Sequence, residues 1–154
     1  MANATIFDRL KQDHDHHRQL FKQMADAADD RERLEQLFEE FRVEVTAHAA
    51  AEEETLYATM LARPDLREDA QHSVSEHKEI DDYLEELQKV DFNGAAWRET
   101  FDKLKKRYLH HIEEEEEEMF PDAAAELTDE EEQKLAATFS KRKPAELQRA
   151  EAAD

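Results

Sequence analysis

Apolar residues recur every three or four positions along most of the chain, which is the spacing of one face of an α-helix. Four long stretches follow this pattern, and Thr5, with Asp8 three residues later, can cap the first of them. Short breaks separate the stretches at Asp29-Asp30, Pro64 and Asn93-Gly94. Long amphipathic helices joined by short loops predict an up-down-up-down four-helix bundle, here over residues 1–125.

The remaining residues, 126–154, predict a helical tail that packs on the bundle or trails from it. Thr128 and Glu131 have the spacing of a capping box for a short fifth helix that ends near Ser140. Pro144 can open a last frayed turn. The predicted fold class is therefore all-α, a four-helix bundle with a short extra C-terminal helix.

Composition supports an all-α chain and restricts its partners. Among 154 residues there are one glycine, three prolines and no cysteine, so strand turns, disulfides and thiolate metal sites are not expected. A formal net charge of −20 argues against nucleic acid and anionic membranes and favours a cation as partner. The absence of a leader-like N-terminus or a membrane-length apolar run favours a cytoplasmic protein, expected to be a monomer or a weak homo-oligomer.

The two halves of the predicted bundle repeat each other with an offset of 63 residues. His14 corresponds to His77, and the acids that precede them, Asp13 and Glu76, also correspond. The segment H-x-x-x-E-E-x-x-(Leu/Met)-aromatic occurs once in each half, beginning at His48 and at His111.

On a helix, a histidine and a glutamate four residues later lie on the same face. Each half thus presents such a pair and one lone histidine to the bundle axis: His14, His48, Glu52, His77, His111 and Glu115. Buried carboxylates without partners lose several kcal/mol of hydration, roughly, and a cation relieves this loss. Four nitrogens and two carboxylates that can bridge suit a pair of metal ions; iron is the first choice, manganese the next, and zinc fits the ligand types.

A single H-x-x-x-E carries little information in so acidic a chain, because 41 of 154 residues are acidic. The specific signal is the repeat, which joins two such pairs to a third pair of histidines. Most of the run of six glutamates at 113–118 is expected to be a solvated face, with Glu113, Glu116 and Glu117 pointing away and only Glu115 facing the axis. The alternative without metal is an acidic helical interaction module whose inward histidines are satisfied core groups.

These motifs resemble the hemerythrin family in its HHE cation-binding form. The resemblance covers residues 5–122 and rests on Asp13-His14, the segment from His48, Glu76-His77 and the segment from His111. It implies a hemerythrin-like bundle that holds a non-haem pair of iron ions with an oxo or hydroxo bridge and bridging Glu52 and Glu115. It also implies binding of, or reaction with, O₂, peroxide or nitric oxide.

The chain departs from the oxygen-carrying members, which have five histidine ligands with H-x-x-x-H on the third helix. Here Ser73 stands four residues before His77, and His72 should miss the site. His17, one turn after His14, is either an additional metal ligand or a hydrogen-bonded core histidine. Tyr108 is either a packing residue or a hydrogen-bond donor beside the metal, and Ser73 leaves an open position there.

Three aromatic residues, Tyr57, Trp97 and Phe120, are expected to pack at the bundle ends. Asp13 and Glu76 are expected to orient or neutralise the neighbouring site. The leading functional hypothesis is a small di-iron protein that binds, senses or reacts with O₂ or nitric oxide, or holds iron in store. An enzyme that consumes peroxide or reduces nitric oxide is the alternative use of the same site.

Overall fold

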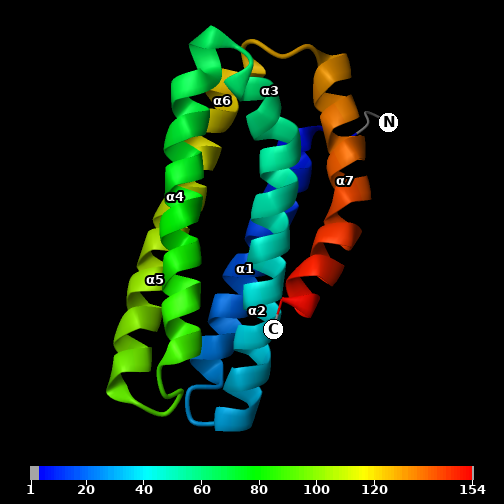
Figure 1. Cartoon of the computed structure of the whole chain (residues 1–154). Helices are drawn as coiled ribbons and strands as arrows, with labels where there is room; N and C mark the ends of the chain where they lie inside the picture. The colour runs from blue at the N-terminus through cyan, green and yellow to red at the C-terminus, as the bar shows by residue number, and fades with distance from the viewer. Residues whose placement is uncertain (1–3, 154) are drawn as a thin grey trace.

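The computed structural model describes residues 4–153, and every regular element in that range is a helix (Figure 1). The elements are α1 (Ile6–Asp26), α2 (Arg31–Glu52), η1 (Glu53–Tyr57), α3 (Ala58–Leu61), α4 (Pro64–Lys89), α5 (Ala95–Glu114), η2 (Glu115–Met119), α6 (Phe120–Ala124) and α7 (Asp129–Ala152). Since α2, η1 and α3 run on without a break, as do α5, η2 and α6, the bundle has four long helices. The predicted fold class is confirmed.

Helix starts follow the local chemistry of the sequence. Thr5 and Asp8 form the expected capping box of α1, and Thr128 and Glu131 form that of α7. Pro64 is the first residue of α4, where its missing N–H is harmless.

The fifth helix is longer than the sequence suggested. It does not end near Ser140 but continues through Pro144 to Ala152. Proline inside a helix removes one hydrogen bond. Both before and after Pro144, however, the buried residues of this helix occur every three or four positions: Glu132, Ala136, Phe139, Lys143, Glu146 and Ala150. Tertiary packing therefore outweighs the local preference of Pro144.

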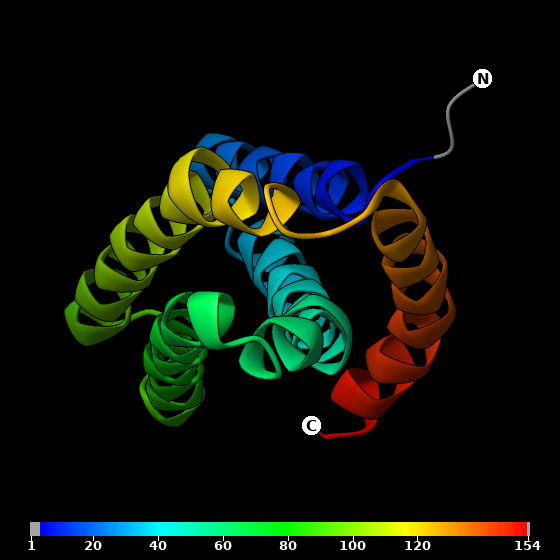
Figure 2. The same cartoon turned by 90° about the horizontal axis from the view of Figure 1, so that it is seen from above.

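Helix α7 packs on α2 and α1 along one side of the bundle, away from α4 and α5 (Figures 1 and 2). Seen from above in Figure 2, it lies outside the four bundle helices rather than among them. The division into residues 1–125 and 126–154 stays a prediction, but the second segment contacts the bundle along its length.

Two short π-helical segments interrupt the long helices. Segment η1 begins at Glu53, directly after Glu52, and η2 begins at Glu115 itself. A π-helical turn uses i→i+5 hydrogen bonds and is wider than an α-turn, and such turns occur often at functional sites. They turn the side chains that follow each H-x-x-x-E pair in directions that α-helical spacing does not predict.

The apolar core forms two clusters separated along the bundle axis. One gathers around Phe21, Phe41 and Trp97, and the other around Leu10, Tyr57 and Phe139. Between them in the sequence of each helix lie the inward histidines and glutamates. The polar layer is thus enclosed by hydrophobic packing at both ends.

Phe41 tests the strength of this packing, because its side chain is fully buried and its ring lies 4.6 Å from that of Phe21, between ring centroids. We expect Phe41→Ala to lower the free energy of unfolding by about 3–5 kcal/mol. Leu61→Ala is the matched control, since Leu61 is exposed, and should change it by less than about 0.5 kcal/mol. Urea unfolding measures both; equal values for the two variants would contradict the assigned core.

Candidate metal centre

All four bundle helices bring side chains to the polar layer. His14 comes from α1, His48 and Glu52 from α2, His77 from α4, His111 from α5 and Glu115 from the first position of η2. All six are buried, and Glu52 and Glu115 are 0% and 1% exposed. The structure therefore brings the six residues predicted from the repeat together at one place.

The ligating atoms form two groups that share Glu52. Glu52, His77, His111 and Glu115 form one group, and His14, His48 and Glu52 form the other, with the atoms of each group within 4.8 Å of one another. The Oε1 atom of Glu52 lies 3.3 Å from Nε2 of His77 and 3.7 Å from Nε2 of His48.

Glu115 also reaches both groups. Its Oε1 atom lies 2.8 Å from Nε2 of His111 and 3.8 Å from Nε2 of His14. Each carboxylate thus lies between one histidine of one group and one histidine of the other. Either carboxylate could therefore contribute an oxygen to a cation held by either group of histidines.

The cluster does not satisfy itself. Among the described residues, the buried side-chain nitrogen and oxygen atoms without a hydrogen-bond partner belong, with the exception of Arg107 Nε, to this layer. They are Nε2 of His14, His17 and His48, Nδ1 of His77 and both carboxylate oxygens of Glu52. Nε2 of His111 and Oε1 of Glu115 belong to the same set but lie 2.8 Å from each other. Leaving such atoms unpaired costs about 1–3 kcal/mol each, so the donor set fits bound cations better than a metal-free core.

Three of the histidines are held from behind by carboxylates. Nδ1 of His14 lies 2.7 Å from Oε2 of Glu116. Nδ1 of His48 lies 2.8 Å from Oδ2 of Asp13, and Nδ1 of His111 lies 2.8 Å from Oε1 of Glu76. A carboxylate at Nδ1 favours the tautomer with its proton there and leaves the Nε2 lone pair free for a metal, which is a common pattern in metal proteins.

Burial and neighbouring charges set the protonation of the layer. Burial lowers the pKa of His48 to about 3, although Asp13 opposes the shift. Burial together with the Glu115 carboxylate raises the pKa of Glu52 well above its usual value. His48 is therefore neutral, which is the form that binds metal.

His111 and Glu115 behave as an ion pair when no metal is bound. Burial lowers the pKa of His111, but the Glu115 and Glu76 carboxylates outweigh it and raise the pKa to about 9. Burial opposes ionisation of Glu115, but the charge of His111 holds its pKa well below the usual value. A proton on His111 thus occupies the place of a cation.

His77 lacks a close carboxylate at Nδ1, since Glu53 Oε2 is 3.6 Å away. Tyr57 lies on its other side, 3.3 Å from hydroxyl to Nε2 of His77, and donates a hydrogen bond of 3.0 Å to Oε2 of Glu115. Tyr57 is buried within η1 rather than being plain packing at a bundle end, so the sequence-based expectation for it was wrong. Ser73 is buried and donates to Sδ of Met119 at 3.3 Å.

His17 and Tyr108 meet as expected from antiparallel neighbours. The Tyr108 hydroxyl lies 2.6 Å from Nδ1 of His17, and both side chains are buried. Neither group of close ligand atoms includes His17, but its Nε2 has no hydrogen-bond partner and its ring centroid is 5.2 Å from that of His48. Burial lowers the pKa of His17 to about 4, so it too is neutral.

Glu116 is the residue that the sequence reasoning misread. It was expected to face solvent, but it accepts from His14 and also from Arg18, whose NH2 lies 2.9 Å from its Oε1. The signal was present in the second glutamate of H-x-x-x-E-E, which both halves contain. Its direction could not be inferred, because the π-helical segment η2 begins one residue earlier.

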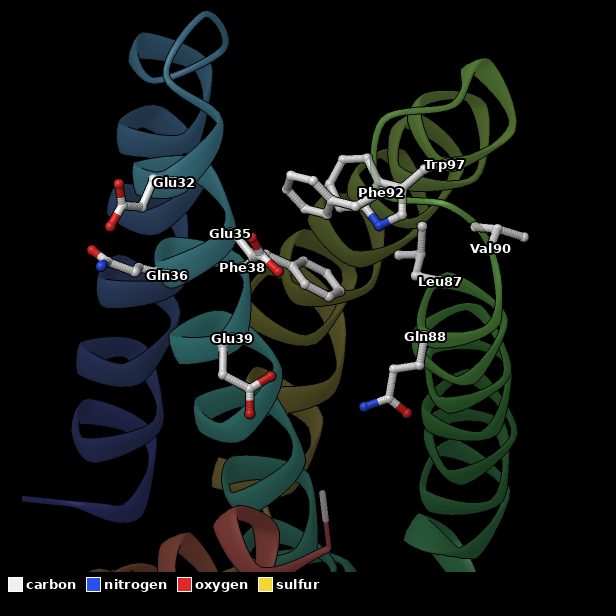
Figure 3. A pocket seen from close by; sticks show the side chains of 10 residues that line it. All are labelled: Glu32, Glu35, Gln36, Phe38, Glu39, Leu87, Gln88, Val90, Phe92 and Trp97. Atoms are coloured by element: carbon white, nitrogen blue, oxygen red, sulfur yellow. The ribbon is translucent and has the colours of Figure 1, made fainter.

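Two of the hollows among the described residues differ in their relation to the layer. A pocket of about 620 Å³ between the start of α2 and the α4–α5 turn is lined by Phe38, Leu87 and Trp97 and by exposed acids, without a histidine (Figure 3). A cavity of about 70 Å³ lies between α4 and η2 and is lined by Ser73, Glu115 and acidic side chains. Only the second of these two reaches a residue of the polar layer.

Comparisons with known proteins agree with this arrangement. The sequence matches the hemerythrin HHE cation binding domain over residues 5–123. A solved structure of a hemerythrin HHE cation binding domain-containing protein from Mycobacterium kansasii is similar, with a TM-score of 0.81 and 23% identity over 96% of this chain and 88% of that one. No curated protein matches the sequence. None of the described helices is long and apolar enough to cross a membrane.

The protonated state of His111 generates a prediction about metal loading. Because its pKa is about 9, a metal ion that binds near neutral pH must displace at least one proton. We therefore expect the affinity for Zn²⁺ to rise with pH up to about pH 9 and then to level off. Calorimetric titration of metal-free protein in buffers of different ionisation enthalpy measures the release; a pH-independent affinity without proton release would contradict it.

Proposed function

Since the chain belongs to the hemerythrin HHE cation-binding domain family, we propose that it is a di-iron protein that binds, senses or reacts with O₂ or nitric oxide. The proposed ligands are His14, His48, Glu52, His77, His111 and Glu115. Manganese and zinc suit the same atoms, but two bridging carboxylates with imidazole nitrogens and open positions favour iron.

The observation that carries the proposal is the sharing of carboxylates between two groups. One cation would leave either the His14 and His48 nitrogens or the His77 and His111 nitrogens without a partner, because Glu52 lies between them. Two cations satisfy every unpaired Nε2 of the six-residue set and both carboxylates. Two bound cations therefore match these nitrogen and carboxylate ligands, and one cation does not.

The bound irons would supply electrons and open coordination positions to a small ligand. The chain's own side chains perform the remaining tasks. Asp13, Glu76 and Glu116 hold the Nδ1 protons of three histidines and so keep Nε2 directed at the centre. Tyr57 fixes one oxygen of Glu115 by donating to it.

The size of the cavity beside Glu115 supports a small ligand. The cavity beside Glu115 holds about 70 Å³, which is room for a few molecules of the size of water. Diatomic molecules and peroxide fit such a space, whereas a larger organic substrate does not. The acidic residues along it, Asp69, Glu114, Glu118 and Asp122, favour the approach of cations.

An enzyme that consumes peroxide or reduces nitric oxide is the second candidate, and one observation favours it. Such reactions need a proton donor, and the Tyr57 hydroxyl touches both Glu115 and His77. Burial and the neighbouring carboxylates raise the pKa of Tyr57 well above its usual value, which keeps this proton in place. Turnover assays with peroxide and with nitric oxide on the iron-loaded protein distinguish an enzyme from a binding protein.

The bridging carboxylates provide the test of the metal centre. We expect the purified protein to hold about two irons per chain, and Glu52→Ala and Glu115→Ala to lose at least half of this metal, since each carboxylate serves both ions. Metal analysis after anaerobic loading measures the content. Glu117→Ala is the control from the same acidic run, because Glu117 is exposed; unchanged iron in both ligand variants would refute the assignment.

His17 is expected to tune the centre rather than to assemble it. The substitution His17→Ile introduces the residue found at the repeat position, Ile80, and should keep both irons but change the visible absorption and weaken azide binding about tenfold. We expect this effect because Nε2 of His17 has no hydrogen-bond partner and the ring lies beside that of His48. Tyr108→Phe removes only the hydrogen bond and should have a smaller effect. Spectra and azide titrations identical to those of the parent protein would assign His17 to the core.

A further inference from the structure

The C-terminal helix α7 sends a charged side chain into the bundle. Lys143 is 5% exposed, and its Nζ lies 2.8 Å from Oδ2 of Asp13 and 3.2 Å from Oε2 of Glu44. A buried lysine is unfavourable unless it is paired, and this one stands on the stripe of α7 that faces the bundle. An apolar residue at this position would pack with less desolvation, so the charge needs an explanation.

Asp13 connects Lys143 to the metal centre. Its Oδ2 atom accepts both from Lys143 and from Nδ1 of His48, which is 2.8 Å away. Its Oδ1 atom accepts from Arg9 at 2.6 Å. Lys143, Asp13 and His48 therefore form a chain of contacts from α7 to a proposed iron ligand.

The second half of the bundle has a corresponding set of contacts, made by different residues. Glu76, which corresponds to Asp13, accepts from Nδ1 of His111 at 2.8 Å and from NH2 of Arg107 at 2.7 Å. His72, the repeat counterpart of Arg9, lies 3.4 Å from Glu76 through Nε2. Asp13 and Glu76 thus each lie beside two basic side chains in addition to the histidine.

The two halves differ in where the second basic group originates. The repeat counterpart of Arg107 is Glu44, 63 residues earlier, which is an acid and cannot serve. Lys143 occupies that role from outside the repeat, and it pairs with Glu44 as well. The ring of Phe139, one turn earlier on α7, packs on His48 with ring centroids 5.7 Å apart.

We propose that Lys143 is a positioning residue of the metal centre, which completes the Asp13–His48 arm from α7 as Arg107 completes the Glu76–His111 arm from α5. Helix α7 then contributes to the site by positioning one of its side chains. The inference rests on the proposed function for its metal, but the contacts themselves do not depend on which metal is bound.

The physical effect of Lys143 is on the electron donation of His48. The lysine shares Oδ2 of Asp13 and so weakens the pull of this oxygen on the Nδ1 proton. Without the lysine, Asp13 draws this proton more strongly, the imidazole becomes a better donor, and one positive charge near the centre is lost. Both changes stabilise the oxidised metal, so the midpoint potential should fall.

Nuclear magnetic resonance of the histidine imidazoles tests the chain of contacts. With zinc-loaded full-length protein as a diamagnetic sample, Lys143→Met should shift the ¹⁵N and Nδ1–H resonances of His48 and leave those of His111 in place. Arg107→Met should do the reverse. Lys141→Met is the control, because Lys141 is exposed on the same helix. Equal shifts at both histidines, or none at His48, would overturn the proposal.

Redox titration of the iron-loaded protein tests the consequence. Lys143→Met should lower the midpoint potential, Lys143→Arg should hold it near that of the parent, and Lys143→Met with Glu44→Arg should restore it by placing the basic group where the second half has Arg107. A lysine that only stabilised the fold would give no such rescue. An unchanged potential in Lys143→Met, or no recovery in the double variant, would overturn the proposal.

The two experiments separate this inference from the proposed function. If the protein took up neither zinc nor iron, the di-iron function would fail, and the same imidazole spectra of the protein without metal would still decide whether Lys143 acts on His48. If Lys143→Met did not fold, Lys143→Arg would carry the comparison, because it keeps the charge but changes the contact with Oδ2 of Asp13. It should shift the His48 resonances and leave those of His111 in place, and no shift at His48 would overturn the proposal.

Discussion

The burial of two carboxylates among imidazoles, with too few protons to satisfy them, is the constraint on which the rest of the structure depends. Glu52 and Glu115 are removed from water, and the atoms that surround them leave several donors and acceptors unpaired. The apolar clusters on either side prevent water from relieving this imbalance through the ends of the bundle. Bound cations would resolve it, and we propose a pair of them because the two groups share Glu52 and Glu115 reaches both.

The surroundings of the layer retain the symmetry of the repeat and depart from it at a few residues. Tyr57 and Phe120 are repeat counterparts, and each stacks on one of the two lone histidines, His77 and His14. Of these two residues only Tyr57 carries a hydroxyl, which donates a hydrogen bond to Glu115. Departures of this kind make the two halves of the polar layer chemically different, and they are the places where reactivity would differ between the two proposed metal positions.

Much of the fold and of the site could be predicted from the sequence because both follow helical periodicity. The bundle, its caps and the six inward side chains follow from spacings of three and four residues, which helix geometry determines, and from the repeat of 63 residues. Glu116 and Tyr57 could not be placed in this way, since both lie in π-helical segments that change the direction of the side chains. The continuation of α7 past Pro144 and the role of Lys143 depend on tertiary packing outside the repeat, for which the sequence contains no periodic signal.

Diffraction from crystals of the iron-loaded protein, with anomalous data at the iron absorption edge, tests the central claim most directly. We expect two anomalous peaks inside the bundle, flanked by the Glu52 and Glu115 carboxylates, one beside His14 and His48 and the other beside His77 and His111. An interior without such peaks, in which these side chains were satisfied by one another or by water, would contradict it.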